Sequence, residues 1–143
     1  MSERDKRVEY WPNGKKRFEI YYKHGMRLYT DYYENGKKRL EGTYKDGKRD
    51  GLWTRWHENG QMKVKGTYKD GKADGLWTSW YEDGQKVGAG TYKDGEMDGL
   101  WTTWHRNGQK MLEATYKGGE SISGKEWDED GNLVPPSSGV FCL

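Results

Sequence analysis

The chain has 143 residues, a formal net charge of +2 and a mean hydropathy of −1.28, which suits one small polar domain. It contains no run of 18 apolar residues, which excludes a membrane-spanning helix. Only 17 residues are Leu, Ile, Val or Phe, a content at which disorder is the default expectation, but aromatic residues make up 15% of the chain. Because tryptophan and tyrosine bury large areas when they pack, we expect a folded domain with an aromatic core.

The start of the chain and its cysteine content predict a cytoplasmic location. The first residues, MSERDKRVEYW, lack the apolar stretch of a secretory signal. The single cysteine, Cys142, has no partner for an internal disulfide, which fits a reducing compartment.

After an N-terminal segment at residues 1–9, the sequence repeats over residues 10–132, in units of about 24 residues that begin near positions 13, 35, 59, 83 and 107. Two series of turn dipeptides mark these units. One is Asn13-Gly14, Asn35-Gly36, Asn59-Gly60, Asp83-Gly84, Asn107-Gly108 and Asp130-Gly131, and the other is His24-Gly25, Asp46-Gly47, Asp70-Gly71, Asp94-Gly95 and Gly118-Gly119. Asn-Gly and Asp-Gly favour two-residue type I′ turns, with positive φ at both positions. We therefore predict an all-β fold, a single-layer antiparallel meander of tandem β-hairpins that forms a repeat solenoid.

The turns also predict how residues pair across strands. A two-residue loop at Asn59-Gly60 places His57 opposite Met62. The same rule gives the pairs Trp53–Gly66, Trp77–Gly90, Trp101–Ala114 and Tyr29–Gly42. A large ring opposite a very small residue shields the backbone that this residue leaves exposed, so the recurrence of such pairs supports the hairpin prediction.

The two tryptophans of each middle unit lie three residues apart, so in a strand they point to opposite faces of the sheet. One face is predicted to carry the structural residues of the repeat, which are Trp53, Trp77, Trp101, Tyr44, Tyr68, Tyr92 and Tyr116 with Gly42, Gly66 and Gly90. The other face is predicted to carry Trp56, Trp80 and Trp104 with Leu52, Leu76 and Leu100.

The two strand segments of a unit differ in length by two residues, which the sheet must absorb by shear or in a bulge. Gly51, Gly75 and Gly99 are the natural bulge sites, and either outcome adds twist, so we expect a twisted, curved ribbon. The first unit is two residues short, and residues 133–143 form a tail that we expect to be flexible.

The recurring pattern GxYKDGKxDGLWTxWxxNGQ resembles the MORN repeat in its bacterial variant form. The segments GTYKDGK at 42–48 and 66–72 and DGLWT at 50–54, 74–78 and 98–102 carry this resemblance, which covers roughly residues 10–132. The resemblance implies a scaffold of repeats. Members with this variant are often labelled YwqK-type antitoxins, which implies neutralising a toxin by binding it, and eukaryotic MORN proteins are associated with protein assembly and with phospholipid binding.

Protein or peptide binding is the function that we predict, on the face of Trp56, Trp80 and Trp104. Their spacing of two strands, roughly 9–10 Å, suits a helix or an extended peptide. Specificity is then expected at the variable positions of that face, which are Lys63, Val87 and Met111 with Lys65, Ala89 and Glu113. The alternative is that these tryptophans belong to the core and are covered by curling of the sheet or by dimerisation.

Three other functions stay open: a structural scaffold that self-associates, contact with membrane lipid headgroups, and an aromatic repeat of the choline- or glycan-binding kind. Nucleic acid is disfavoured, because a stripe that tracks phosphates would not change from Lys63 to Val87 and Met111 in successive units.

No catalytic residue, metal or cofactor is expected. His57 and His105 share their repeat position with Tyr81, which a metal site would not tolerate, and we expect them to stack beside the turns. The Asp-Gly pairs lack the EF-hand spacing, and no nucleophile has an orienting partner.

Overall fold

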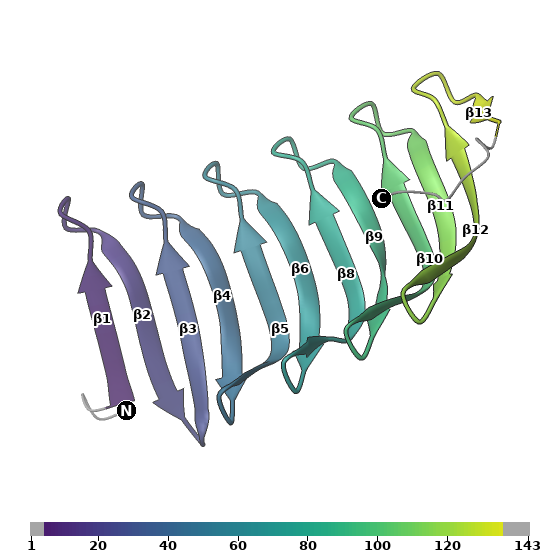
Figure 1. The fold of residues 1–143 in the computed structure, drawn as a ribbon. Coiled ribbons are helices and arrows are strands. Elements are labelled where there is room, and N and C mark those ends of the chain that lie inside the picture. The colour runs from purple at the N-terminus through teal and green to yellow at the C-terminus, as the bar shows by residue number, and fades with distance from the viewer. Residues whose placement is uncertain (1–4, 136–143) are drawn as a thin grey trace.

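A computed structural model describes residues 5–135 as one open antiparallel sheet, in which strands that follow one another in the chain lie side by side (Figure 1). The strands are β1 Lys6–Tyr10, β2 Lys16–Lys23, β3 Met26–Tyr32, β4 Lys38–Lys45, β5 Lys48–Trp56, β6 Met62–Lys69, β7 Lys72–Ala73, β8 Gly75–Trp80, β9 Lys86–Lys93, β10 Glu96–Trp104, β11 Lys110–Lys117, β12 Glu120–Trp127 and β13 Leu133–Val134. Only the short β7 lies off this path, paired with β6. The described residues contain no helix long and apolar enough to cross a membrane. The predicted all-β meander is confirmed.

The ends of the sheet reach into both expected terminal segments. Residues 6–9 belong to β1, which pairs with β2, and Leu133 and Val134 form β13 against β12. The expected flexible tail otherwise falls on residues 136–143, which lie outside the described residues.

The turns of the second series, which begins at His24-Gly25, are as predicted. At Asp46-Gly47, Asp70-Gly71 and Asp94-Gly95, all six residues have φ between 50° and 84°. The flanking lysines Lys45 and Lys48 pair directly across the first of these turns. Both observations define two-residue type I′ turns.

The turns of the first series, which begins at Asn13-Gly14 and includes Asp83-Gly84 and Asp130-Gly131, differ from the prediction. At Asn59-Gly60 only the glycine takes positive φ, at 89°, and the His57 N–H donates to the Gln61 carbonyl at 2.8 Å. Asn59 instead accepts the Gln61 N–H on its side-chain oxygen at 2.9 Å, which favours an ordinary turn followed by a left-handed glycine. The loop therefore holds three residues, and Trp56 rather than His57 lies opposite Met62.

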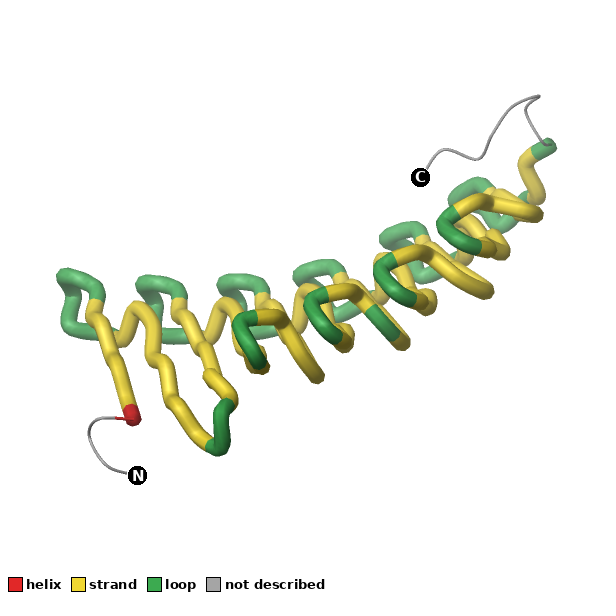
Figure 2. Tube along the Cα trace, turned by 60° about the horizontal axis from the view of Figure 1, so that its bottom comes forward, coloured by secondary structure: helices red, strands yellow, loops and turns green. Residues whose placement is uncertain are grey.

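The two extra residues of each later unit form a bulge. Across β4 and β5 the register passes from Glu41↔Thr54 to Thr43↔Asp50, so Gly42 alone faces residues 51–53. Gly51, Gly75 and Gly99 have φ of 71°, 98° and 82°, which confirms them as the bulge sites. The two-residue-short β2–β3 hairpin pairs without a shift. In Figure 2 this hairpin hangs straight, whereas the hairpins of the later units bend back.

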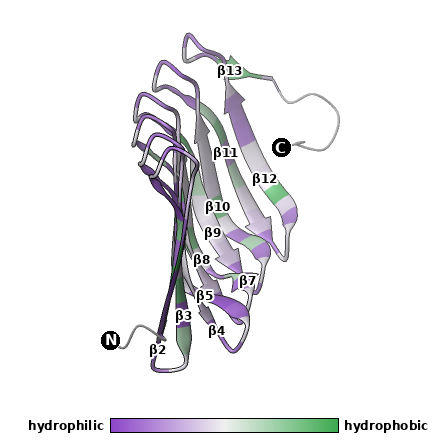
Figure 3. Ribbon diagram, turned by 90° about the vertical axis from the view of Figure 1, so that its left-hand side faces the viewer, coloured by the Kyte–Doolittle hydropathy of each residue, from purple (hydrophilic) through white to green (hydrophobic). Residues whose placement is uncertain are grey.

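The core is a line of aromatic rings that we call the aromatic ladder: Tyr44, Trp53, Tyr68, Trp77, Tyr92 and Trp101. Consecutive rings meet edge to face, with centroids 5.0–6.0 Å apart and planes at 79–89°. Trp53 is only 3% exposed, and a smaller cluster of Leu112, Ala114 and Tyr116 continues the core. Coloured by hydropathy, the sheet shows hydrophilic turns and only isolated hydrophobic segments (Figure 3), as expected for a core of amphipathic rings.

The glycine beneath each indole is not the one that the sequence predicted. The register pairs Trp53–Gly66, Trp77–Gly90, Trp101–Ala114 and Tyr29–Gly42 are all present. However, a Cβ on Gly42, Gly66 or Gly90 would lie 2.0–2.1 Å from the ring of Trp53, Trp77 or Trp101, respectively. Each indole therefore covers the glycine of the preceding unit, because the bulge carries the ring across the preceding strand.

Each covering indole is also fixed by a hydrogen bond. Nε1 of Trp53, Trp77 and Trp101 donates to the carbonyl of Thr43, Thr67 and Thr91, respectively, at 2.9–3.1 Å. These carbonyls flank the bulges, where the strand ladder is interrupted. The tryptophan thus satisfies backbone that the bulge has freed.

Candidate binding faces

The face of the sheet that carries the aromatic ladder is hollowed, and we call it the hollowed face. Three hollows follow one another along it, of about 870, 220 and 310 Å³. The first lies over β1–β4 and includes Phe18 and Tyr29 in its walls. The second and third share Val64 and Trp77 as walls, so they are adjacent, and we call the pair the groove, which crosses two repeat units.

The first hollow contains an ion pair with a buried carboxylate. Asp31, which is only 4% exposed, accepts two hydrogen bonds from the Arg39 guanidinium, at 2.7 and 3.1 Å, and one from the Tyr29 hydroxyl at 3.0 Å. Burial and the Asp31 charge both raise the pKa of Tyr29. The Asp31 carboxylate and the Arg39 guanidinium therefore satisfy each other within this hollow.

The groove formed by the second and third hollows changes character along its length. Arg49 and Arg55 line the second hollow, and no carboxylate is among its described lining residues. The third hollow is lined by Val64, Val87 and Met97, among others, and by no charged side chain among those described. The groove is thus basic at one end and apolar at the other.

Arg49 is held over the rings of Trp53 and Tyr68, with its guanidinium carbon 4.7 and 5.3 Å from the ring centroids. Burial alone would lower its pKa, but hydrogen bonds to Tyr68 and Tyr44 outweigh burial and raise the pKa above its ordinary value. Arg49 is therefore a fixed positive charge at every physiological pH.

Charge is distributed unevenly along the whole chain. Residues 1–72 hold 19 Lys and Arg against 11 Asp and Glu, whereas residues 73–143 hold 6 against 12. The small net charge of +2 therefore conceals a basic half and an acidic half. Counting charges by half of the chain would have revealed this feature from the sequence.

The opposite face carries the predicted binding tryptophans, and we call it the row face. Trp56, Trp80 and Trp104 are half-buried there. The Nζ atoms of Lys38 and Lys86 each lie 5.7 Å from the ring centroid of Trp56 and Trp104, respectively. The same strands carry leucines whose exposed fractions are large: Leu52 50%, Leu76 62% and Leu100 56%.

The variable positions do not all lie where the sequence placed them. Val87 lines the third hollow beside Trp77 and Trp101, so its predicted place on the face of Trp80 is wrong. The three-residue loop makes the second residue of each following strand a bulge residue, which shifts its side chain. Lys63 and Lys65 are exposed, Met111 is 37% exposed, and Ala89 and Glu113 are half-buried.

The turn histidines bond to the next unit rather than stack. Nε2 of His57 lies 2.9 Å from the Trp80 carbonyl and that of His105 lies 2.8 Å from the Trp127 carbonyl. The hydroxyls of Tyr33 and Tyr81 donate to the carbonyls of Trp56 and Trp104 in the same way. These residues therefore tie successive units together.

The Asn-Gly turns form a second connection between units, which the sequence analysis missed. The side-chain amides of Asn13, Asn35, Asn59 and Asn107 each donate to a carbonyl of the next turn at 2.7–2.9 Å. Asp83 holds the same repeat position, and a carboxylate has no hydrogen to donate. The recurrence of Asn where Asp also suits the turn was the available signal.

Asp83→Asn should therefore raise the free energy of unfolding by about 1 kcal/mol, the usual net value of one added hydrogen bond. The new amide would donate to the Arg106 carbonyl and keep the Gln85 N–H bond that Asp83 already accepts at 2.9 Å. Urea denaturation followed by tryptophan fluorescence measures the change. Asn59→Asp is the reciprocal control, and its free energy of unfolding should fall by a similar amount. An Asp83→Asn protein no more stable than the parent would contradict the turn-to-turn connection.

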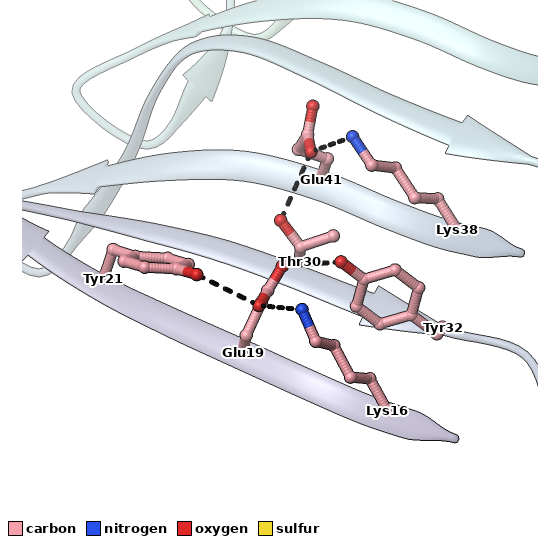
Figure 4. A network of polar contacts seen from close by, with 7 residues as sticks. All are labelled: Lys16, Glu19, Tyr21, Thr30, Tyr32, Lys38 and Glu41. Atoms are coloured by element: carbon pink, nitrogen blue, oxygen red, sulfur yellow. Dashed lines mark hydrogen bonds and ion pairs between the residues drawn. The ribbon is translucent and has the colours of Figure 1, made fainter. Parts of the chain in front are cut away.

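A polar network lies on the row face of the first two units (Figure 4). Glu19, 9% exposed, accepts hydrogen bonds from Tyr32 at 2.6 Å, Lys16 at 3.0 Å and Tyr21 at 3.2 Å. Burial alone would raise the pKa of Glu19, but these three donors and the Lys16 charge outweigh it, so the pKa lies below its ordinary 4.5. Burial and the bond to Glu19 raise the pKa of the Tyr32 hydroxyl far above its ordinary value.

Glu19→Gln should lower the free energy of unfolding by about 1–3 kcal/mol at pH 7, since it removes charge-assisted hydrogen bonds. A carboxylate whose pKa is lowered by folding stabilises above its unfolded pKa, near 4.5, and loses that contribution as the pH falls through the lower folded value. The difference between the two proteins should therefore shrink below pH 4.5 in urea denaturation series. Glu41→Gln, at the exposed Lys38 ion pair, is the control with little effect. A difference that is constant with pH would contradict the assignment.

No group of three or more His, Cys, Asp or Glu side chains within residues 5–135 is arranged to hold a metal ion.

Comparison with known families assigns the repeat. The MORN repeat variant matches five successive segments, at residues 6–24, 28–46, 49–70, 73–94 and 97–117. The chain belongs to the MORN repeat variant family. MORN repeats are in general modules that contact proteins or membranes and are not enzymes. A comparison with curated proteins finds no match.

Proposed function

We propose that this protein is a non-catalytic protein-binding module that takes a segment of its partner into the groove of the hollowed face. The observation that carries the proposal is that the second and third hollows are adjacent and share Val64 and Trp77 across two units. A preformed groove lowers the ordering cost of binding, and the rings that line it are themselves fixed by the aromatic ladder.

Gly88→Leu tests this proposal by filling the groove. Gly88 lines the third hollow, its φ is not in the left-handed region, and a Cβ there would meet no atom closer than 3.5 Å. The variant should fold normally and lose at least about tenfold in affinity for the partner, because the leucine takes the partner's place. The measurement is affinity capture from cells that make the protein, quantified against the parent. Undiminished capture by a folded Gly88→Leu protein would refute binding in the groove.

The row face is the second candidate, because Trp80 lies there and the leucines on its own strand and on the strand of Trp104, Leu76 and Leu100, are more than half exposed. If Trp80 is a hot spot, Trp80→Ala should weaken capture by about 2 kcal/mol or more while far-UV and near-UV spectra stay native. Loss of capture in Trp80→Ala but not in Gly88→Leu would assign binding to the row face.

A finer proposal is that the partner is a toxin which this protein occludes, as an antitoxin does. The resemblance of the repeat motivates it. Each reading frame beside the gene would be expressed alone and then together with this protein. Growth arrest that the parent relieves and Gly88→Leu does not would support the proposal, and the absence of a toxic neighbour would count against it.

A further inference from the structure

The basic end of the groove holds an unbalanced charge. The second hollow contains Arg49 and Arg55 without a carboxylate among its described walls. Within residues 5–135, the side chain of Arg55 forms no ion pair, hydrogen bond or ring contact, and its neighbours across the strands are Leu40 and Val64. The exposed guanidinium of Arg55 therefore has donors that can bind an anion.

The repeat shows which anion is missing. Asp31 and Arg55 hold the same repeat position, and so do Arg39 and Lys63. In the earlier unit this pair of positions is an ion pair, Arg39–Asp31, at 2.7 Å. In the later unit both positions are cationic. The arrangement that pairs an arginine with a carboxylate in the earlier unit therefore has no carboxylate in the later one. A carboxylate from another molecule would complete it.

Arg49 lines the same hollow, and its side chain is already held in place. It donates from Nη1 to the Tyr68 hydroxyl at 3.1 Å and lies over the rings of Trp53 and Tyr68. A guanidinium has five N–H donors, so this bond leaves others for a ligand. Because the side chain is already immobilised, binding costs little further side-chain entropy.

The apolar end of the groove lies one repeat unit further along. Equivalent positions in successive units are two strands apart, which is about 9–10 Å. A polyproline II segment that crosses the strands covers this distance in about three residues, and it returns to the same side every three residues. An acidic side chain over Arg55 thus places the third residue away over the hollow of Val87 and Met97.

We propose that this groove recognises an extended segment in which an acidic residue and a large apolar residue lie three positions apart. The inference rests on the proposed function and specifies the partner's chemistry. The charge of the chain agrees with it, since the groove's cations belong to the basic half, residues 1–72. Single-stranded nucleic acid fits less well, because the rings of the aromatic ladder already pack on one another or on Arg49, and the third hollow has no described cation to follow the phosphates.

The probe is a fluorescein-labelled peptide that contains Glu-Pro-Pro-Leu between Gly-Ser flanks, titrated with the full chain and followed by fluorescence anisotropy. Two control peptides carry Gln in place of Glu, or Glu and Leu side by side with the same composition. We expect saturable binding of the first peptide that weakens with salt, and at least about tenfold weaker binding of both controls.

Two protein variants locate the site. Arg55→Gln should weaken the probe at least about tenfold and abolish the preference for Glu over Gln, whereas Arg106→Gln, which removes the same charge from the acidic half, should change nothing. Gly88→Leu should remove the preference for the three-residue spacing. Equal binding of all three peptides, or an Arg55→Gln protein that binds like the parent, overturns the inference.

Other occupants of the groove give different results. Tighter binding of a thymidine oligonucleotide than of the probe, lost in Arg55→Gln, would assign the site to nucleic acid. Salt-sensitive self-association lost in Arg55→Gln would assign it to the acidic half of a second copy. Either result overturns the inference. If Gly88→Leu still abolishes capture of the native partner while the probe does not bind, the proposed function stands and only this inference fails.

Discussion

Gly66→Ala should destabilise the protein by about 3 kcal/mol or more, although it adds one methyl group. The new Cβ would lie 2.0–2.5 Å from three ring atoms of Trp77, a separation that carbon atoms cannot adopt. The indole cannot tilt away at low cost, because Tyr68 and Tyr92 pack against it edge to face and its Nε1 is bonded to the Thr67 carbonyl. Urea denaturation followed by circular dichroism measures the loss.

Gly88→Ala is the matched control for this experiment. Gly88 lies in the next unit on the same face, and a Cβ there would meet its nearest atoms at 3.5 Å, an ordinary contact distance. We expect a change of less than about 0.5 kcal/mol, or a slight gain from the lower entropy of the unfolded chain. Equal effects of the two substitutions would show that glycine is needed in these strands for backbone flexibility and not for space beneath the indole ring.

Trp53→Ala should lower the free energy of unfolding by about 3–5 kcal/mol, the usual cost of deleting a buried large aromatic residue. Trp53 is the most buried ring of the ladder, at 3% exposed, and packs between Tyr44 and Tyr68. Its loss also uncovers Gly42 and leaves the Thr43 carbonyl without its indole donor. A loss this large approaches the whole stability of a small domain.

Trp53→Phe separates the contributions of the ring and of the indole N–H. Phenylalanine keeps much of the packing but cannot donate to Thr43, so the loss should be smaller by at least about 1 kcal/mol. Trp56→Ala, at the half-buried tryptophan three residues away on the row face, should cost clearly less than Trp53→Ala in the same urea titration. If Trp56→Ala proved the more damaging substitution, the core would lie on the other face.

Much of the fold could be predicted from local sequence, because turn chemistry and two-residue periodicity act over short distances. The pairing of Trp53 with Gly66 and the bulges at Gly51, Gly75 and Gly99 follow from counting residues between turns. The prediction for the Asn59 turn was wrong because both Asn and Asp suit two kinds of turn, and the dipeptide alone does not select one. Asp83-Gly84 takes the same three-residue turn as Asn59-Gly60, although Asp83 has no amide to donate to the next turn.

The candidate site was less predictable. Which face of the sheet carries the Val87 side chain depends on the length of the preceding loop. One extra loop residue converts a regular strand position into a bulge. The glycine that each indole covers depended on where the bulge carries the ring, which strand periodicity does not encode. Lys63 was predicted as a specificity position on the face of Trp56, and Arg55 was not singled out. The proposed carboxylate site became visible only when the structure aligned these residues with Asp31 and Arg39.

The seating of every indole on the glycine of the unit before it gives the solenoid a direction. Each middle unit offers a glycine to its successor and a tryptophan to its predecessor, so the joint between units is the same wherever it occurs. A duplicated stretch of 24 residues, cut at the same point of the repeat, would arrive with both halves of the joint already in place. The architecture therefore permits growth by whole cassettes, and length can change in evolution or in engineering without a new core.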